Sequence, residues 1–92
     1  DYIKAVKNKI VNALYYPKEA KDADWQGTLK LSLLVSANGS LKDVKVLQST
    51  GYKILDDAGI NLVRSVAPFP ALPAQLNLEE LRIEIPVIYH KD

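Results

Sequence analysis

The chain has 92 residues, with 12 Lys and Arg against 11 Asp and Glu, so its formal net charge is +1. This length provides for one small hydrophobic core, and the 48% hydrophobic and 25% charged residues are typical of an ordinary globular domain rather than a disordered segment. The balanced charge argues against bulk electrostatic binding of nucleic acid, and the absence of Cys excludes disulfides and thiolate metal sites.

The chain begins at Asp1 and contains no Met. Because translation starts with Met, we expect residues 1–92 to be a single domain cut from a longer protein. No apolar run approaches the roughly 18 residues of a membrane-spanning helix. Any membrane-spanning element of the longer protein is therefore expected to lie before this domain.

Apolar residues at steps of three and four predict an amphipathic helix from Asp1 to Leu14. The helix ends before Tyr16-Pro17, because the residue that precedes a proline is disfavoured in the helical conformation. The predicted buried stripe consists of Ile3, Val6, Ile10 and Leu14.

Alternation with a period of two predicts three strands, at residues 28–36, 41–48 and 81–89. The first two flank Asn38-Gly39, which predicts a type I′ hairpin turn because both residues tolerate positive φ. Val44 and Val46 are expected to face the core from the second strand. Pro86 has no N–H, so we place the third strand at an edge of the sheet. The missing N–H is best tolerated on the free edge, so we expect Arg82, Glu84 and Ile88 to point their backbone groups toward that edge as well.

A second helix is predicted after the turn and cap signal of residues 49–51. Leu55, Ala58, Leu62 and Val66 recur at helical spacing up to Pro68. Gly59 lies inside this helix, where glycine costs about 1 kcal/mol relative to alanine, so we expect close packing at that position. The proline-rich segment 68–73 is expected to be a stiff connector.

These elements predict an α+β fold in the order α-β-β-α-β. Two helices with one apolar stripe each would cover one face of a three-stranded antiparallel sheet, which makes a two-layer sandwich. Such a sheet has two edges. A long edge strand at the end of the chain is either protected, paired with another chain, or used for recognition.

The residues needed for catalysis or metal binding are few. His90 lies near the end of the chain, where nothing holds a general base in position. Asp56 and Asp57 are adjacent in the second helix and are interpreted as first-turn acids that oppose the helix dipole, rather than as a metal site. We therefore expect no enzymatic activity, no cofactor and no metal.

Aromatic residues admit two interpretations each. Tyr16 either fastens the connector to the core or, with Pro17, forms the wall of a peptide groove, and Tyr15 is left open between the two. Trp25 is interpreted as a half-buried lid over the first strand, with a partner contact as the alternative.

The order of these motifs resembles the C-terminal domain of the TonB family of energy transducers. The resemblance begins at Tyr16-Pro17, continues through the strand that Gly27 opens and the Asn38-Gly39 turn, and covers nearly the whole chain. It rests further on the segments Asp43-Val44-x-Val46, Ser49-Thr50-Gly51, Leu55-Asp56, Ala58 and Pro68-Phe69-Pro70.

The resemblance implies a periplasmic module of a protein that is anchored in the inner membrane. In the family, an ExbB-ExbD-type motor acts through the N-terminal part, and the C-terminal domain grips the TonB box of an outer-membrane TonB-dependent transporter by strand addition. Shortened members form strand-exchanged homodimers, so the resemblance implies that this chain is able to form such a dimer. The partner-binding residues expected here are Arg82, Ile83, Glu84, Ile85, Pro86, Val87, Ile88 and Tyr89 of the last strand, with Tyr15, Tyr16 and Pro17.

One position departs from the family pattern. The best-known members have a Gln three residues before the Tyr-Pro pair, where this chain has Ala13 within its long first helix. A TolA-like or scaffold module that binds a folded periplasmic protein is the alternative interpretation. It would use Leu34 and Ile88 as an apolar patch on the outer face of the sheet.

Overall fold

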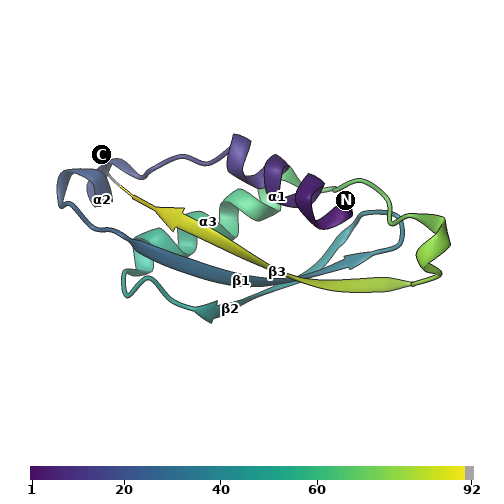
Figure 1. Cartoon of the computed structure of the whole chain (residues 1–92). Coiled ribbons are helices and arrows are strands. Elements are labelled where there is room, and N and C mark those ends of the chain that lie inside the picture. The colour runs from purple at the N-terminus through teal and green to yellow at the C-terminus, as the bar shows by residue number, and fades with distance from the viewer. Residues whose placement is uncertain (91–92) are drawn as a thin grey trace.

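The computed structural model describes residues 1–90 and shows an elongated molecule with its helices on one side of a sheet (Figure 1). The predicted α+β class and the order α-β-β-α-β are confirmed. One short helix within the first connector was not predicted from the sequence. The elements are α1 (Tyr2–Asn12), α2 (Lys18–Asp22), β1 (Gly27–Ser36), β2 (Leu41–Gln48), α3 (Lys53–Val66), a 3-10 turn η1 (Ala74–Leu76) and β3 (Glu80–Tyr89).

The sheet has the strand order β2-β1-β3, with both pairs antiparallel. The β1–β3 pairing runs from Gly27 opposite Tyr89 to Ser36 opposite Glu80 in one uninterrupted register. The β1–β2 pairing instead shifts register at two places, after Lys30 and after Leu34. Because β1 is central, β3 is an edge strand, as Pro86 predicts.

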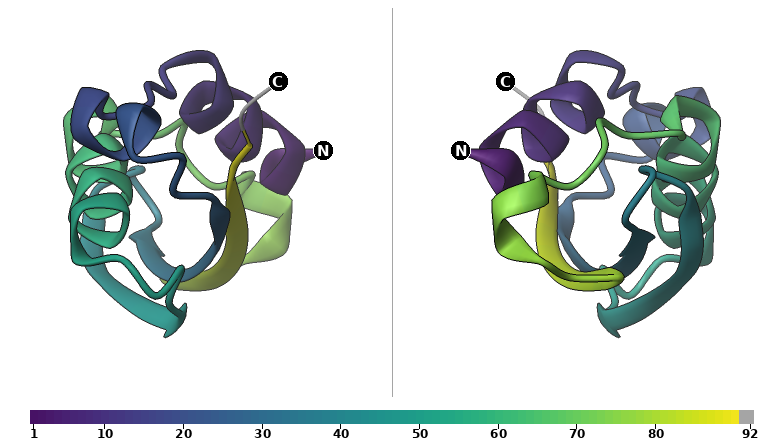
Figure 2. Two further views of the ribbon diagram at one scale, coloured as in Figure 1. Left: turned by 90° about the vertical axis from the view of Figure 1, so that its left-hand side faces the viewer. Right: turned by 90° about the vertical axis from the view of Figure 1, so that its right-hand side faces the viewer.

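The helices form the second layer. Figure 2 shows α3 over the β2 side of the curved sheet and α1 over the β3 side. The core lies between the layers, where inward side chains of β1 and β3 meet the apolar stripes of the helices. Its buried members include Val6, Ile10, Leu29, Leu31, Leu33, Val35, Leu55, Leu62, Val63, Phe69, Ile83, Ile85, Val87 and Tyr89.

The β1–β2 connection differs from the predicted type I′ turn. Positive φ occurs at Gly39 (+92°) but not at Asn38, and the Gly39 amide donates to the Ser36 carbonyl over 2.9 Å. The Phe69 amide donates to the Gly39 carbonyl, and a Cβ on Gly39 would lie 1.9 Å from the Phe69 oxygen. This contact with the proline-rich connector, rather than the hairpin alone, determines the shape of the turn.

Two apolar residues that were expected in the core are largely exposed. Ile3 is 47% exposed, because it lies in the first turn of α1 while Val6 and Ile10 make the buried contacts. Val46 is 40% exposed although it pairs with buried Leu31. It lies near the end of the edge strand β2, where residues 45–48 are all exposed, so this end of the strand is not covered by the core.

Candidate functional site

The backbone of β3 alternates between its neighbour and the free edge of the sheet. The Ala37 amide donates to the Glu79 carbonyl over 2.8 Å, and these two residues extend the β1–β3 register by one pair. On the opposite side of the chain, the preceding Ser36 amide donates to Ser40. In an antiparallel ladder this alternation continues along the strand, so odd-numbered residues of β3 bond to β1 and even-numbered residues face outward.

This parity agrees with the arrangement expected from Pro86. Arg82, Glu84 and Ile88 present both an N–H and a C=O group at the free edge, whereas Pro86 presents only a C=O group. The intervening side chains point into the core. Those of Ile83, Ile85, Val87 and Tyr89 are each at most 3% exposed. β3 therefore presents a row of outward backbone groups at the free edge, while its inward side chains are packed in the core.

An apolar groove lies beside this edge, between α1 and the end of β3. We call it the α1–β3 groove, and it encloses about 180 Å³. Val11 and Ile88 on its two sides are 48% and 59% exposed. The lining residues are Lys7, Ile10, Val11 and Leu14 of the α1 segment and Pro86, Val87 and Ile88 of β3.

Tyr16 fastens the first connector to the core. Its half-buried ring meets the Tyr89 ring edge-on at a centroid distance of 5.6 Å, and its hydroxyl donates to the Trp25 carbonyl. Trp25 is itself half-buried and stacks on Tyr52 at 4.8 Å with 13° between the ring planes. Tyr16 thus has the first of the two roles considered for it, and Trp25 is half-buried as expected.

Tyr15 and Pro17 lie elsewhere. Together with Ile54, Ala58 and other residues of α3, they line a shallow hollow of about 430 Å³, and Tyr15 is 52% exposed. The structure does not bring this hollow and the α1–β3 groove into one pocket. The wall beside β3 is formed by α1, which sequence reasoning missed. The signal was Val11, an apolar residue placed off the buried stripe.

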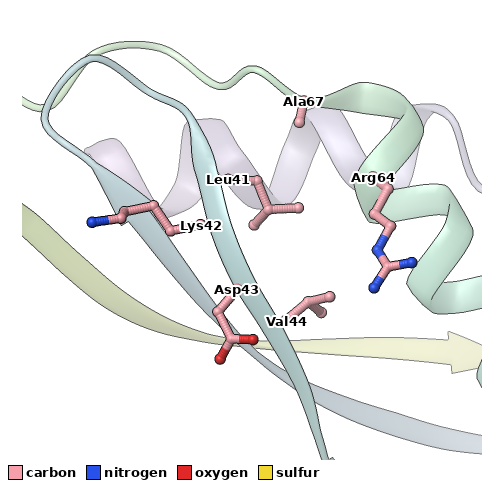
Figure 3. A pocket seen from close by; sticks show the side chains of 6 residues that line it. All are labelled: Leu41, Lys42, Asp43, Val44, Arg64 and Ala67. Carbon is pink, nitrogen blue, oxygen red and sulfur yellow. The ribbon is translucent and has the colours of Figure 1, made fainter.

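The other sheet edge is less regular. A polar hollow of about 330 Å³ lies between β2 and the end of α3. Figure 3 shows Leu41 and Val44 reaching toward α3, with the charged ends of Lys42 and Asp43 turned away from it. Lys42 is paired with Glu80 over 2.7 Å. Two register shifts and the exposed Lys45 make β2 a poor template for another strand.

Leu34 and Ile88 do not form one patch. The register places Leu34 opposite Arg82 and Ile88 opposite Thr28, so the two positions are six residues apart along β3. At about 3.3 Å per residue, roughly 20 Å separates them. Leu34 is also half-buried. The apolar patch expected for a flat scaffold interface is therefore absent at these positions.

The acidic residues of α3 have structural partners. Asp56 accepts hydrogen bonds from the Thr50 amide at 3.0 Å, the Thr50 hydroxyl at 2.7 Å and the Ser49 hydroxyl. Burial raises the pKa of this carboxyl, but the three hydrogen bonds outweigh burial and hold its pKa below the ordinary value. Asp57 pairs with Lys53 over 2.7 Å. Asp56 thus holds residues 49–50 against the first turn of α3, and Asp57 forms an ion pair within that turn.

The described residues offer no other chemical centre. Across residues 1–90 no three His, Cys, Asp or Glu side chains are placed to hold a metal ion. His90 is exposed at the end of β3. None of the helices in this part of the chain is long and apolar enough to cross a membrane.

These features define a small α+β interaction domain with an open sheet edge beside an apolar groove. The family model described as the Gram-negative bacterial TonB protein C-terminal matches residues 12–90. The chain belongs to this family, the C-terminal domains of TonB-type energy transducers, which is a family of non-enzymatic interaction domains.

Curated relatives agree with this assignment. The chain is 38% identical over 82 residues to protein TonB of Haemophilus influenzae, an alignment that covers 85% of this chain and 30% of that protein. It is 27% identical over 89 residues to protein TonB of Helicobacter pylori, with 97% of this chain and 30% of the relative covered. The chain thus spans about a third of these relatives.

Solved structures show the same fold. The solution NMR structure of the Helicobacter pylori TonB C-terminal domain superposes with a TM-score of 0.84 and 26% identity, covering 99% of this chain and 81% of that one. TolAIII bound to a peptide derived from the N-terminus of TolB superposes with a TM-score of 0.70 over 98% of this chain and 73% of the other. At 19% identity, the TolAIII likeness concerns the fold alone.

Proposed function

We propose that this domain grips the TonB box of an outer-membrane transporter by strand addition to β3, and transmits force derived from the proton gradient. The longer protein would be anchored in the inner membrane, with the domain in the periplasm and an ExbB-ExbD-type motor acting on the N-terminal part. The observation that carries the proposal is the free edge of β3, where Arg82, Glu84 and Ile88 present outward backbone groups. Family membership supports the same assignment.

Strand addition suits this edge for a physical reason. An extended peptide gains main-chain hydrogen bonds from a sheet edge without displacing any packed side chain. The side chains of Ile83, Ile85 and Val87 are already buried beneath β3, so the strand is held in place before a peptide arrives. Among the remaining expected contacts, Tyr16 and Tyr89 would act by holding the end of this strand. Tyr15 and Pro17 would act from outside the groove.

A titration of the isotopically labelled domain with short synthetic TonB-box peptides tests the proposal. The peptides should shift the amide resonances of residues 82–88 more than those of β2. Glu84→Pro removes one edge donor, and the loss of one backbone hydrogen bond should weaken binding by roughly two- to tenfold. Glu84→Ala is the matched control, since it removes the same side chain and keeps the donor.

Two results would contradict strand addition at β3. The first is the absence of any amide shift with peptide at millimolar concentration. The second is a Glu84→Pro variant that binds as tightly as Glu84→Ala. Shifts confined to the outer sheet face around Leu34 would favour a TolA-like or scaffold role, with a folded protein as the partner.

A further inference from the structure

Pro86 interrupts the row of donors on β3. At residues 82, 84 and 88 an added strand meets an N–H group, but at Pro86 it meets the ring carbon that replaces the N–H. A carbonyl of the added strand at this point would lack a donor, which costs free energy when the site is dry. Backbone pairing is therefore weakened at Pro86, between the donors of Glu84 and Ile88.

The α1–β3 groove lies beside this same stretch. Pro86, Val87 and Ile88 form one of its sides, and Ile10, Val11 and Leu14 form the other. All six residues are apolar. The volume of about 180 Å³ accommodates one aliphatic side chain, since it exceeds the roughly 30 Å³ share of a water molecule several-fold. The groove thus offers side-chain contacts next to the position where the backbone ladder lacks a donor.

The one charge that lines the groove is positive. Lys7 lies on the α1 side, and among residues 1–90 no ion pair involves it. Lys4, one turn earlier on the helix, is also exposed. A peptide with an acidic side chain next to its apolar residue is favoured over a basic peptide at this position.

We propose that the α1–β3 groove is a specificity subsite, which takes one branched aliphatic side chain of the added strand and an acidic neighbour beside Lys7. This inference rests on the proposed strand addition and divides the binding site into two parts with different roles. The residue 82–84 edge holds the backbone of any extended segment, and α1 selects the sequence. The helix is therefore part of the binding site.

Two pairs of variants on α1 test the subsite. Val11→Ser and Ile3→Ser change apolar residues that are 48% and 47% exposed, and only Val11 lines the groove. Lys7→Glu and Lys4→Glu change exposed lysines of the same helix, and only Lys7 lines it. Because all four side chains are exposed, all four variants should fold, which circular dichroism verifies before binding is measured.

The probe is the TonB-box peptide that binds in the titration, together with a series in which Ser replaces each of its residues in turn. Val11→Ser should weaken binding of the parent peptide by roughly tenfold, and Ile3→Ser should leave it unchanged. The effect of Val11→Ser should vanish for one Ser-substituted peptide, which identifies the residue that fills the groove. Lys7→Glu should weaken binding by about threefold at low salt and less at high salt.

The outcomes separate the subsite from strand addition. If Glu84→Pro weakens binding while Val11→Ser binds like Ile3→Ser, the subsite is wrong and strand addition stands. The subsite is also wrong if Val11→Ser weakens every peptide of the series equally. If Glu84→Pro and Glu84→Ala bind alike, strand addition fails and the subsite fails with it.

Discussion

Gly59 of α3 packs directly against Leu29 of β1, so closely that a Cβ on Gly59 would lie 2.2 Å from the Leu29 Cδ2 atom. Both residues are buried. The glycine thus sets the distance between the helix layer and the central strand. This explains why the sequence retains a residue that disfavours helix at the middle of an otherwise regular helix.

The first prediction concerns this contact. Gly59→Ala should lower the free energy of unfolding by about 1–3 kcal/mol, because the overpacking outweighs the gain of about 1 kcal/mol in helix propensity. Urea unfolding followed by circular dichroism measures the change. Asn61→Ala on the exposed side of the same helix serves as the control, where propensity alone acts. A stabilised Gly59→Ala variant would contradict the close approach.

The second prediction compares proline substitutions at two neighbouring positions of β3. Glu84 faces the free edge, so Glu84→Pro should fold with a modest loss of stability. Ile85 bonds to β1 and is 1% exposed, so Ile85→Pro removes a ladder bond and a packed side chain and should cost about 3 kcal/mol or more. Thermal unfolding of the two variants checks the order, and the reverse order would show that the assigned parity is wrong.

The third prediction concerns acid stability. The folded pKa of Asp56 lies below its unfolded value of 3.8, so its contribution is fully present above about pH 4 and is lost as pH falls through the folded pKa. At neutral pH, Asp56→Asn should cost about 1 kcal/mol, since the carboxyl is only partly buried. The cost should shrink as the pH falls below 3.8 and through the folded pKa. Unfolding curves across this range test it, with Asp57→Asn as the adjacent control.

The fourth prediction concerns alkaline stability. Burial raises the pKa of Tyr89 from 10.0 to about 12. The native state then holds its proton where the unfolded state has lost it, so this group's contribution falls as pH rises from about 10 to 12. Within residues 1–90 the Tyr89 hydroxyl has no hydrogen-bond partner. Tyr89→Phe should therefore be at least as stable as the parent at pH 7 and lose less stability between pH 10 and 12. An identical alkaline loss in both proteins would refute the assignment.

Sequence periodicity predicted the helices and strands that each bury one apolar face against the core. The alternation in β1 and β3 and the α3 stripe predict the observed elements closely, since each places its apolar residues against a continuous core. The five-residue α2 is too short to show a helical period. Val46 obeys the strand pattern and is still exposed, because burial also depends on what lies above an edge strand.

The candidate site was predicted less completely. Pro86 alone predicted the edge strand and the outward parity, since a proline restricts backbone pairing wherever it lies. Tyr15 and Pro17 were expected beside β3 because an aromatic-proline pair is apolar and rigid, but the chain turns them toward α3. The groove wall comes from α1, and the angle at which α1 crosses the sheet is a tertiary property that no local pattern records.

The uninterrupted register between β1 and β3 also has a mechanical consequence. Ten paired positions run along the longest dimension of the molecule, which measures 46 Å against 21 and 18 Å in the other directions (Figure 1). Tension along that direction stresses all the backbone hydrogen bonds between β1 and β3 at once, in shear. Tension across the sheet would instead break these hydrogen bonds one after another. A strand bound lengthwise on β3 inherits this geometry. In pulling experiments, rupture should need more force lengthwise than crosswise, and equal forces would contradict the shear arrangement.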